Sequence, residues 1–437
     1  MNYSVQDVLD FVAENDVKFV KLSFCDIFGN LRNISVLAAE LKKAFKSGIP
    51  FDASVVKGFD TAVDGDLLLI PDPSTLFVLP WRPQFGRVIR LFCDIKNPDG
   101  TDFVSDSRQI LRKNAKALSD MGYECTIGSN CEFYVFKTDE HGNVTKIPID
   151  NAGCYDAAPL DKCENLRRDI CLTLEEMNIS PTSSYHEKGA GQNEIHFKNS
   201  TTLTAADNLI TFKSVVKTIT AGNGMYASFM AKPLADTFGN GLAVSFSITK
   251  KAQNIFDEKS DCFGEGLSFI AGVLDKIKEI TVFANTNVNS YHRLGCFDAP
   301  KYISWTDKNY IHLLRVRCHD GSASRIELRL PDPACNPYLL FSLVISAGID
   351  GIKNKQKPIP AVNADLYTDI FAVSGLSVIP LSLAEAVAAA KESSFVTDAL
   401  PAETVKSYLN IKAEESLLYE KSSDKEMFET ENYFNII

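Results

Sequence analysis

The stretch that most constrains the fold is Arg325-Ile326-Glu327-Leu328-Arg329, in which charged and apolar residues alternate strictly. This alternation predicts a β-strand, because successive side chains of a strand point to opposite faces. The apolar face requires a core to cover it. The other face carries an Arg-Glu-Arg row, which fits a site that holds an anionic substrate together with a metal ion. A solvated face with a surface ion pair is the alternative that this stretch alone leaves open.

Length and composition narrow the class of protein. A chain of 437 residues is too long for one compact core and predicts two or three domains. The net charge of −11 disfavours nucleic acid or an anionic membrane as a partner, since both call for a basic surface. Eleven cysteines without a CxxC pair, and six histidines without HxH or HExxH spacing, disfavour a disulfide framework and a histidine-rich zinc site. With no signal-peptide pattern and no apolar run of membrane-spanning length, we expect a cytoplasmic protein.

Two units are expected along the chain. Residues 1–103 combine short strands with one main helix, and a hairpin turns at Asp26–Asn30. Residues 104–437 mix strands and long amphipathic helices without regular strand-helix alternation, which favours the α+β class. In this larger unit we predict strands at 124–136, 242–248 and 325–330, and helices at 107–121, 205–220, 265–284 and 338–353.

The densest polar motif of the chain is Tyr185–Ile195. Two glycines between Glu187 and Glu194 permit a tight backbone excursion, so the two carboxylates can converge. Converging carboxylates repel each other and need a cation, and Mg²⁺ or Mn²⁺ takes oxygen ligands of this kind. Glu132, on a predicted strand, is a candidate third ligand. For any one of the three glutamates, solvated surface is the alternative.

These segments resemble the glutamine synthetase family, type I. The resemblance rests on three long motifs, Gly128–Phe136, Glu187–Ile195 and Arg325–Tyr338, and on shorter ones in the family's order, among them Phe51–Ser54, Pro71–Thr75, Phe229–Pro233 and Asn289–Leu294. It implies an N-terminal β-grasp-like domain at 1–103. It also implies a catalytic domain at 104–437, with an antiparallel sheet flanked by helices, of the glutamine synthetase/guanido kinase-like type.

The resemblance also implies a reaction and an assembly. The family joins the γ-carboxylate of glutamate to ammonia, driven by ATP, through an acyl phosphate. Its cofactors are ATP and Mg²⁺ or Mn²⁺. Its subunits form a dodecamer of two hexameric rings, with active sites between neighbouring subunits, so the implied partners are small-molecule substrates and further copies of the chain.

Residue by residue, the match implies a set of roles. The metal ligands are Glu132, Glu187 and Glu194 in the first site and Glu327 in the second. The substrate residues are Gly239, Arg293 and Arg329, and the nucleotide residues are Ser247 and Arg325. The catalytic residues are Arg315 at the phosphate, Asp52 donated by the neighbouring subunit to the ammonium site, and Asp298 in a flap where the family has the longer glutamate.

Departures from the family cluster in the pocket. Asn130 and Ala243 replace a glutamate and a histidine of the second metal site, so that site is degraded while the first is intact. Three further positions differ, namely Ser245 for a histidine near ATP, Phe238 for an asparagine at the substrate, and Tyr310 for an arginine at phosphate. Because scaffold motifs hold while pocket residues change, the pattern indicates an altered or relaxed function.

Two classes of function remain open from the sequence. The first is an ATP-dependent carboxylate-amine ligase, supported by the first metal triad and the arginines. The second is a non-catalytic binding or regulatory oligomer, supported by the pocket departures. A γ-glutamyl ligase for an organic amine is a variant of the first, and between the two classes we favour the enzyme.

Overall fold

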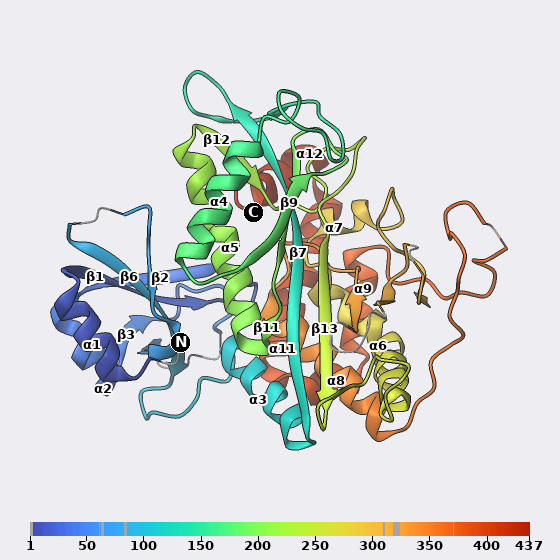
Figure 1. Ribbon diagram of the computed structural model, residues 1–437, viewed down its shortest axis with the longest axis horizontal. Helices are drawn as coiled ribbons and strands as arrows, with labels where there is room; N and C mark the ends of the chain where they lie inside the picture. Colours follow the sequence, from blue (N-terminus) through green and yellow to red (C-terminus); the bar gives the residue numbers. More distant parts are fainter. Residues whose placement is uncertain are drawn as a thin grey trace.

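The structure is a computed structural model that describes residues 3–60, 62, 65–82, 85–308, 311–317, 324–369 and 371–437. Tyr310, one of the pocket departures, lies outside these described residues. The chain forms a small N-terminal sheet and a larger sheet covered by helices (Figure 1). The N-terminal part, drawn in blue, lies at one side of the larger unit (Figure 1).

The N-terminal unit is built as its local sequence predicts. Ser4 and Asp7 form a capping box that opens the first helix, and Gly48 ends the second with a left-handed φ of 75°. Its six-stranded sheet has the order β2-β1-β6-β4-β3, with β5 on β6, and the β1–β6 pair is parallel. The elements are α1 (Val5–Glu14), β1 (Val17–Cys25), β2 (Leu31–Leu37), α2 (Leu41–Ser47), β3 (Ile49–Asp52), β4 (Asp66–Pro71), β5 (Phe77–Val78) and β6 (Arg87–Lys96).

The larger sheet contains eleven strands among the described residues, with the path β15-β16-β17-β13-β7-β10-β9. Every pair on this path is antiparallel except β15–β16. Its strands are β7 (Tyr123–Thr138), β8 (Val144–Pro148), β9 (Pro181–His186), β10 (Gln192–Phe197), β11 (Ser200–Thr201), β12 (Met225–Ser228), β13 (Leu242–Lys250), β14 (Gln253–Asn254), β15 (Trp305–Thr306), β16 (Leu314–Arg317) and β17 (Arg325–Leu328).

Long helices cover this sheet and supply much of the core. α6 and α8 pack along each other, α3 and α5 contact α8, and α5 also lies on β7. The helices are α3 (Ser107–Asp120), α4 (Glu164–Glu176), α5 (Thr202–Gly222), α6 (Phe263–Ala284), α7 (Val288–Arg293), α8 (Pro337–Lys353), α9 (Leu383–Lys391), α10 (Ser394–Ala399), α11 (Ala402–Lys421) and α12 (Lys425–Glu429). β7 runs through the centre of this unit (Figure 1).

The α+β class and the long elements predicted from periodicity are confirmed. The predicted helix at 265–284 is α6, and the predicted strand at 124–136 is β7. The predicted strand at 325–330 is shorter, since β17 ends at Leu328 and leaves Arg329 just beyond it. Its charged face is not solvated, because Glu327 has only 1% of its surface exposed.

A buried arginine joins the two units. Arg108 at the start of α3 donates to Asp72 at 2.8 Å and to Asp94 at 2.9 Å, both in the N-terminal part. It also donates to Asp207 on α5, whose carboxylate accepts from the Tyr338 hydroxyl of α8 at 2.6 Å. One guanidinium therefore holds together carboxylates from three segments that are distant in sequence.

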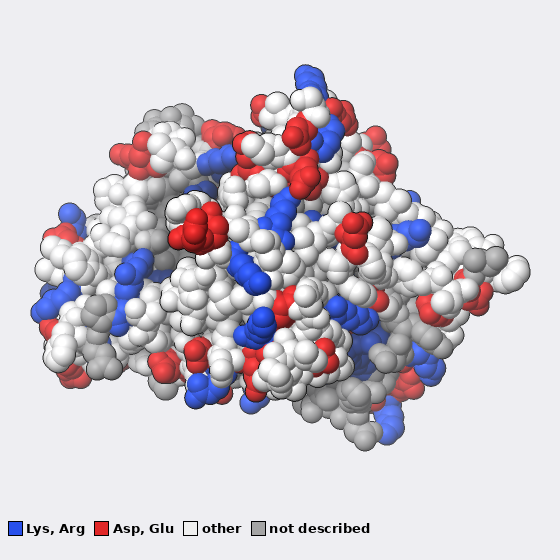
Figure 2. Space-filling view, turned by 90° about the horizontal axis from the view of Figure 1, so that it is seen from above, with Lys and Arg blue, Asp and Glu red and all other residues white. Residues whose placement is uncertain are grey.

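The surface carries charges of both signs. On the face seen in Figure 2, basic and acidic side chains lie interspersed in small groups. None of the helices within the described ranges is both long and apolar enough to cross a membrane.

We expect the change Arg108→Met to destabilise the protein by about 3–5 kcal/mol, because it leaves the buried carboxylate of Asp207 without its cation. The measurement is the shift of the urea-unfolding midpoint. The matched control is Lys116→Met, which removes an exposed ion pair with Asp120 on the same helix and costs at most about 1 kcal/mol. Equal midpoints for the two variants would contradict the role assigned to Arg108.

Candidate active site

A cleft of about 430 Å³ opens on one face of the larger sheet. Residues two apart on a strand share a face, so Asn130 and Glu132 of β7 both reach it. Ala243 of β13 lies directly opposite Asn130, and Glu194 of β10 lies directly opposite Glu132. The strand register therefore brings together the positions that the sequence analysis singled out.

Three carboxylates converge at one end of the cleft. Glu132, Glu187 and Glu194 each offer an oxygen, and these oxygens lie within 4.8 Å of one another. Glu187 comes directly after β9, and the return of the chain into β10 brings Glu194 beside it. Gly191 makes this return possible, because its φ is 71° and a Cβ there would lie 2.8 Å from the Val135 carbonyl oxygen.

The local electrostatics of this triad favour a bound cation. Burial raises the pKa of Glu132, and the nearby charges of Glu194 and Glu187 raise it further. Burial and the charge of Glu194 raise the pKa of Glu187 to about 7. Burial acts upward on the pKa of Glu194 too, but hydrogen bonds from His196 and Tyr185 outweigh it and lower that pKa. These hard oxygen donors fit a divalent ion such as Mg²⁺ or Mn²⁺.

Arginines crowd around Glu327 at the other end of the cleft. Its Oε1 accepts from Arg315 and from Arg329, each at 3.0 Å. Its Oε2 lies 3.0 Å from the Arg317 guanidinium. The buried carboxylate of Glu327, which is 1% exposed, thus holds three guanidinium groups in place.

The residues at this end do not fit a second divalent ion. Asn130 offers a neutral amide and Ala243 offers no ligand atom. Both oxygens of Glu327 already accept from guanidinium groups, whose positive charges would repel an incoming cation. In the described part of the chain, the three glutamates of the triad form the cleft's group of possible metal ligands.

Arg293 and Gly239 form the wall between the two ends. Arg293 at the end of α7 donates to the Leu330 carbonyl at 2.9 Å and to the Arg329 carbonyl at 3.2 Å. Burial lowers its pKa. A Cβ on Gly239 would lie 2.5 Å from the Ala231 carbonyl oxygen and 3.0 Å from the Arg293 side chain, so this position requires glycine.

The mouth of the cleft carries a salt bridge and an aromatic pair. The Asp298 carboxylate accepts from the Lys188 ammonium, and both residues line the cleft. The Phe238 and Phe297 rings lie 4.7 Å apart between centroids. The Lys188 ammonium lies 5.4 Å from the Phe238 ring. This side of the mouth is therefore partly apolar.

Four residues expected at the site do not line the cleft of this chain, namely Glu327, which is buried among the arginines described above, and Asp52, Ser247 and Arg325. Asp52 lies exposed at the end of β3 and accepts from the Ser54 amide at 2.9 Å. The Ser247 hydroxyl donates to the Ser324 carbonyl at 3.1 Å, and Ser247 lies on the same face of β13 as Ala243 but four residues further along the strand. Arg325 lies opposite Arg317 in the β16–β17 pair. Their assigned roles stay predictions.

Arg317, Lys188 and Phe297 are among the cleft residues that sequence reasoning missed. Arg317 carried a usable signal, since Arg315-Val316-Arg317 alternates with period two and places both arginines on one face. For Lys188 and Phe297, no periodic signal exists, because both lie in irregular segments.

A carboxylate triad facing fixed arginines is the arrangement of an enzyme that handles phosphate groups with a divalent ion. Comparison with known protein families supports this class of enzyme. Residues 16–98 match the family described as "Glutamine synthetase, beta-Grasp domain", and residues 104–433 match "Glutamine synthetase, catalytic domain".

Full-length relatives give the same result. Glutamine synthetase of Clostridium saccharobutylicum is 41% identical and covers 99% of both chains, and that of Methanosarcina mazei is 40% identical with 92% of both covered. A solved structure entitled "GmaS/ADP complex-Conformation 1" is 27% identical with a TM-score of 0.87, covering 98% of this chain and 99% of that one. The chain belongs to the glutamine synthetase family, whose members are ligases that use ATP and divalent metal ions.

We expect the change Glu187→Gln to weaken Mn²⁺ binding by about tenfold or more, because an amide replaces one of three charged ligands. The measurement is the rise of the melting temperature on adding Mn²⁺, which reports binding to the folded state. Glu124→Gln, an exposed change on β7, serves as the control and keeps the full rise. A Glu187→Gln protein with an undiminished rise would place the ion elsewhere.

Proposed function

We propose that the chain joins the γ-carboxylate of glutamate to ammonia with ATP, through an acyl phosphate. The observation that carries this proposal is the carboxylate triad and the arginine cluster on one face of one sheet. A divalent ion held by the triad, when bound, neutralises charge on phosphate oxygens. The relatives named glutamine synthetase, at up to 41% identity over nearly the full length, support the choice of substrates.

The arginines supply the electrostatic part of the reaction. Arg315, Arg317 and Arg329 are held by Glu327, so their guanidinium groups need little reorganisation when an anion enters. In our proposal, Arg315 and Arg317 stabilise the charge on the transferring phosphoryl group. Ser247 on β13 and Arg325 on β17 lie two residues further along their strands than the paired Ser245 and Glu327. We propose that they contact the nucleotide.

The remaining cleft residues orient the acid and the amine. Arg293 and Arg329 bind the carboxylate end of the substrate, and Gly239 leaves room for it. Asp298 takes a proton from the amine once Lys188 releases it, so that the neutral amine attacks. The side chain of Asp298 is one methylene shorter than the glutamate of the family, and its pairing with Lys188 fixes it at the mouth.

The aromatic pair at the mouth favours a second candidate, a ligase of this type that uses an organic amine or another acid. Phe238 and Phe297 present apolar surface where the family has a polar contact to the substrate. Apolar surface gains from burial against an alkyl group, which ammonia does not have.

The assembly we propose is a dodecamer of two hexameric rings in the cytoplasm. Asp52 then completes the cleft of a neighbouring subunit, which agrees with its exposed position away from the cleft of its own chain. Small molecules are the substrates.

We further propose that one divalent ion binds tightly in each cleft, and that the Arg317 guanidinium supplies the second positive charge. The triad keeps three charged ligands, whereas the Glu327 end has a single carboxylate and three arginines. An arginine needs no ligand shell and does not dissociate. The loss of the family's glutamate and histidine, at the positions of Asn130 and Ala243, is thereby compensated.

The test of the reaction is ATP hydrolysis by the purified protein with Mn²⁺, first with glutamate and ammonium, then with a panel of acids and alkylamines. We expect turnover that depends on both the acid and the amine. Arg317→Met should lower kcat by about 10²-fold, because it removes a charge that stabilises the transition state. The matched control is Arg168→Met on the exposed face of α4.

The outcomes separate the candidates. Turnover with alkylamines but not ammonium would select the second candidate. Nucleotide binding without turnover on any pair would overturn the ligase and leave a binding oligomer. Sedimentation of the same preparations measures the assembly, and an active monomer would contradict the shared role of Asp52.

The metal proposal has its own test, the number of tight Mn²⁺ ions per chain measured by calorimetry. We expect one ion in the natural protein and one in the double variant Asn130→Glu/Ala243→His, because Arg317 still repels a second ion. We expect two ions in the triple variant that adds Arg317→Met. Two tight ions in the natural protein would contradict this account of Arg317.

A further inference from the structure

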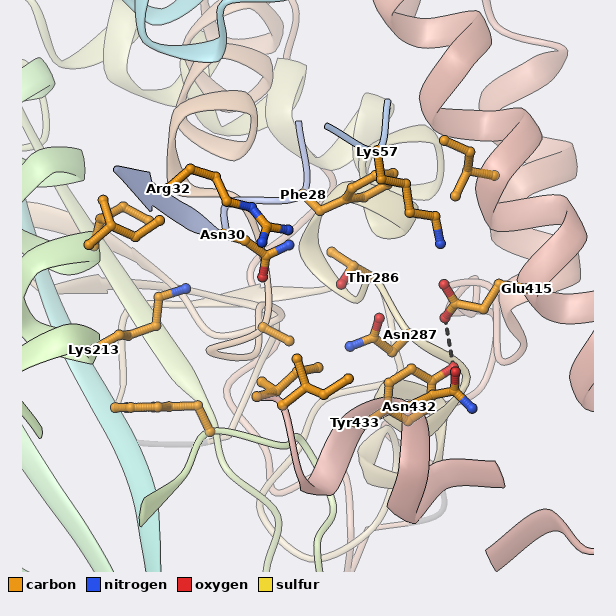
Figure 3. Close-up of a pocket in the computed structure, with 18 of the residues that line it drawn as sticks. Phe28, Asn30, Arg32, Lys57, Lys213, Thr286, Asn287, Glu415, Asn432 and Tyr433 are labelled. Atoms are coloured by element: carbon orange, nitrogen blue, oxygen red, sulfur yellow. Dashed lines mark hydrogen bonds between the residues drawn. The ribbon is translucent and has the colours of Figure 1, made fainter. Parts of the chain in front are cut away.

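A second cavity, of about 800 Å³, lies between the N-terminal unit and the C-terminal helices (Figure 3). Its walls come from the β1–β2 turn, from α5, from α11 and from the last residues of the chain. It shares no described lining residue with the cleft. Its volume is typical of a small-molecule site.

The cavity is lined by more cations than anions. Figure 3 shows Arg32, Lys57 and Lys213 pointing into the open space from different elements. The basic residues of the lining are Arg32, Lys57, Lys213, Lys217 and Lys412, against the acidic residues Glu414 and Glu415.

Two of the cations are already neutralised. Arg32 pairs with Asp26 at 3.0 Å. Lys412, almost fully buried, pairs with Glu415 at 2.8 Å, and the same carboxylate accepts from the Tyr433 hydroxyl at 2.7 Å. Glu415 is therefore fully used and does not balance the other lysines.

The other three cations have no carboxylate within ion-pair distance among the residues that the structure describes. The Lys213 ammonium donates to the Pro333 carbonyl at 3.1 Å, and the Lys217 ammonium donates to the Ile436 carbonyl at 2.8 Å. The Lys57 ammonium lies 5.9 Å from the Phe28 ring. A neutral carbonyl leaves the positive charges of the partly buried Lys213 and Lys217 uncompensated, whereas the exposed Lys57 is solvated.

Lys213 and Lys217 lie four residues apart on α5, so they share one face of the helix. Burial lowers the pKa of Lys217 to about 8, and the charge of Lys213 adds to this effect. Two like charges held together at a cavity wall are relieved by an anion. The Phe28 ring, 5.1 Å from the Lys412 ammonium, adds an apolar surface beside them.

We propose that this cavity binds a small organic anion with at least two negative charges, either a dicarboxylate or a phosphorylated compound. Lys213 and Lys217 contact one anionic group from α5, and Lys57 contacts the other from across the cavity. The carbon skeleton packs against Phe28. This site is separate from the catalytic cleft and does not depend on the reaction proposed above.

The test is calorimetry on the full-length, Mn²⁺-loaded protein, with saturating ADP present to occupy the catalytic cleft. The probes are succinate and inorganic pyrophosphate, and neutral succinamide is the control for charge. We expect at least one anion to bind, and Lys213→Met/Lys217→Met to weaken its binding by about tenfold or more. Higher salt should also weaken the binding.

Arg168→Met on the exposed face of α4 is the matched control variant, because it removes a cation that lines neither the cavity nor the cleft and should leave this binding unchanged. Lys57→Met, on an exposed loop, gives a second test if the double variant does not fold. The relative affinity of succinate and pyrophosphate distinguishes a carboxylate ligand from a phosphate ligand. Three results would overturn the proposal: no binding of either anion, equal binding of succinamide, or a neighbouring subunit seated in the cavity of the assembled protein.

Discussion

The active site of this structure depends on the electrostatic repulsion among three carboxylates, which the fold has to counteract. Three carboxylate oxygens lie within 4.8 Å of one another in a partly buried position, and such charges separate unless a scaffold or a cation holds them. The β7–β10 register places Glu132 directly opposite Glu194, and Gly191 returns the chain so that Glu187 closes the group. The strands supply the position, and a bound ion supplies the charge.

The same sheet face shows the opposite balance at its other end. There a single carboxylate, Glu327, accepts from three guanidinium groups. With Ala243 and Asn130 in place of the family's histidine and glutamate, we propose that the Arg317 guanidinium takes the place of a dissociable ion. The two ends of the cleft thus need opposite counterions. The carboxylates at one end favour a cation, and the arginines at the other end favour an anion.

Periodicity and short motifs were sufficient to predict the fold class, the long elements and the convergence of Glu132, Glu187 and Glu194, because these depend on local alternation and on motifs of a few residues. Periodicity was insufficient for features that depend on contacts between residues distant in sequence. The solvated alternative for Glu327 is wrong, since β16 covers that face with Arg315 and Arg317. The Arg108 network joins Asp72 to Asp207, which no local pattern reports. The domain boundary at 103 stays a prediction, as does the role of Asp52, which needs a neighbouring subunit.

The cavity and the cleft are connected through one short helix. Lys412, buried in the cavity wall, donates to the Asn287 side chain at 3.2 Å. The Asn287 amide donates to Ser290 at 3.2 Å at the start of α7, and α7 ends at Arg293, which lines the cleft. Because α7 has only six residues, a shift of its first turn moves its last residue as well. The wall of the cavity is therefore joined to Arg293 in the wall of the cleft by two hydrogen bonds and one short helix.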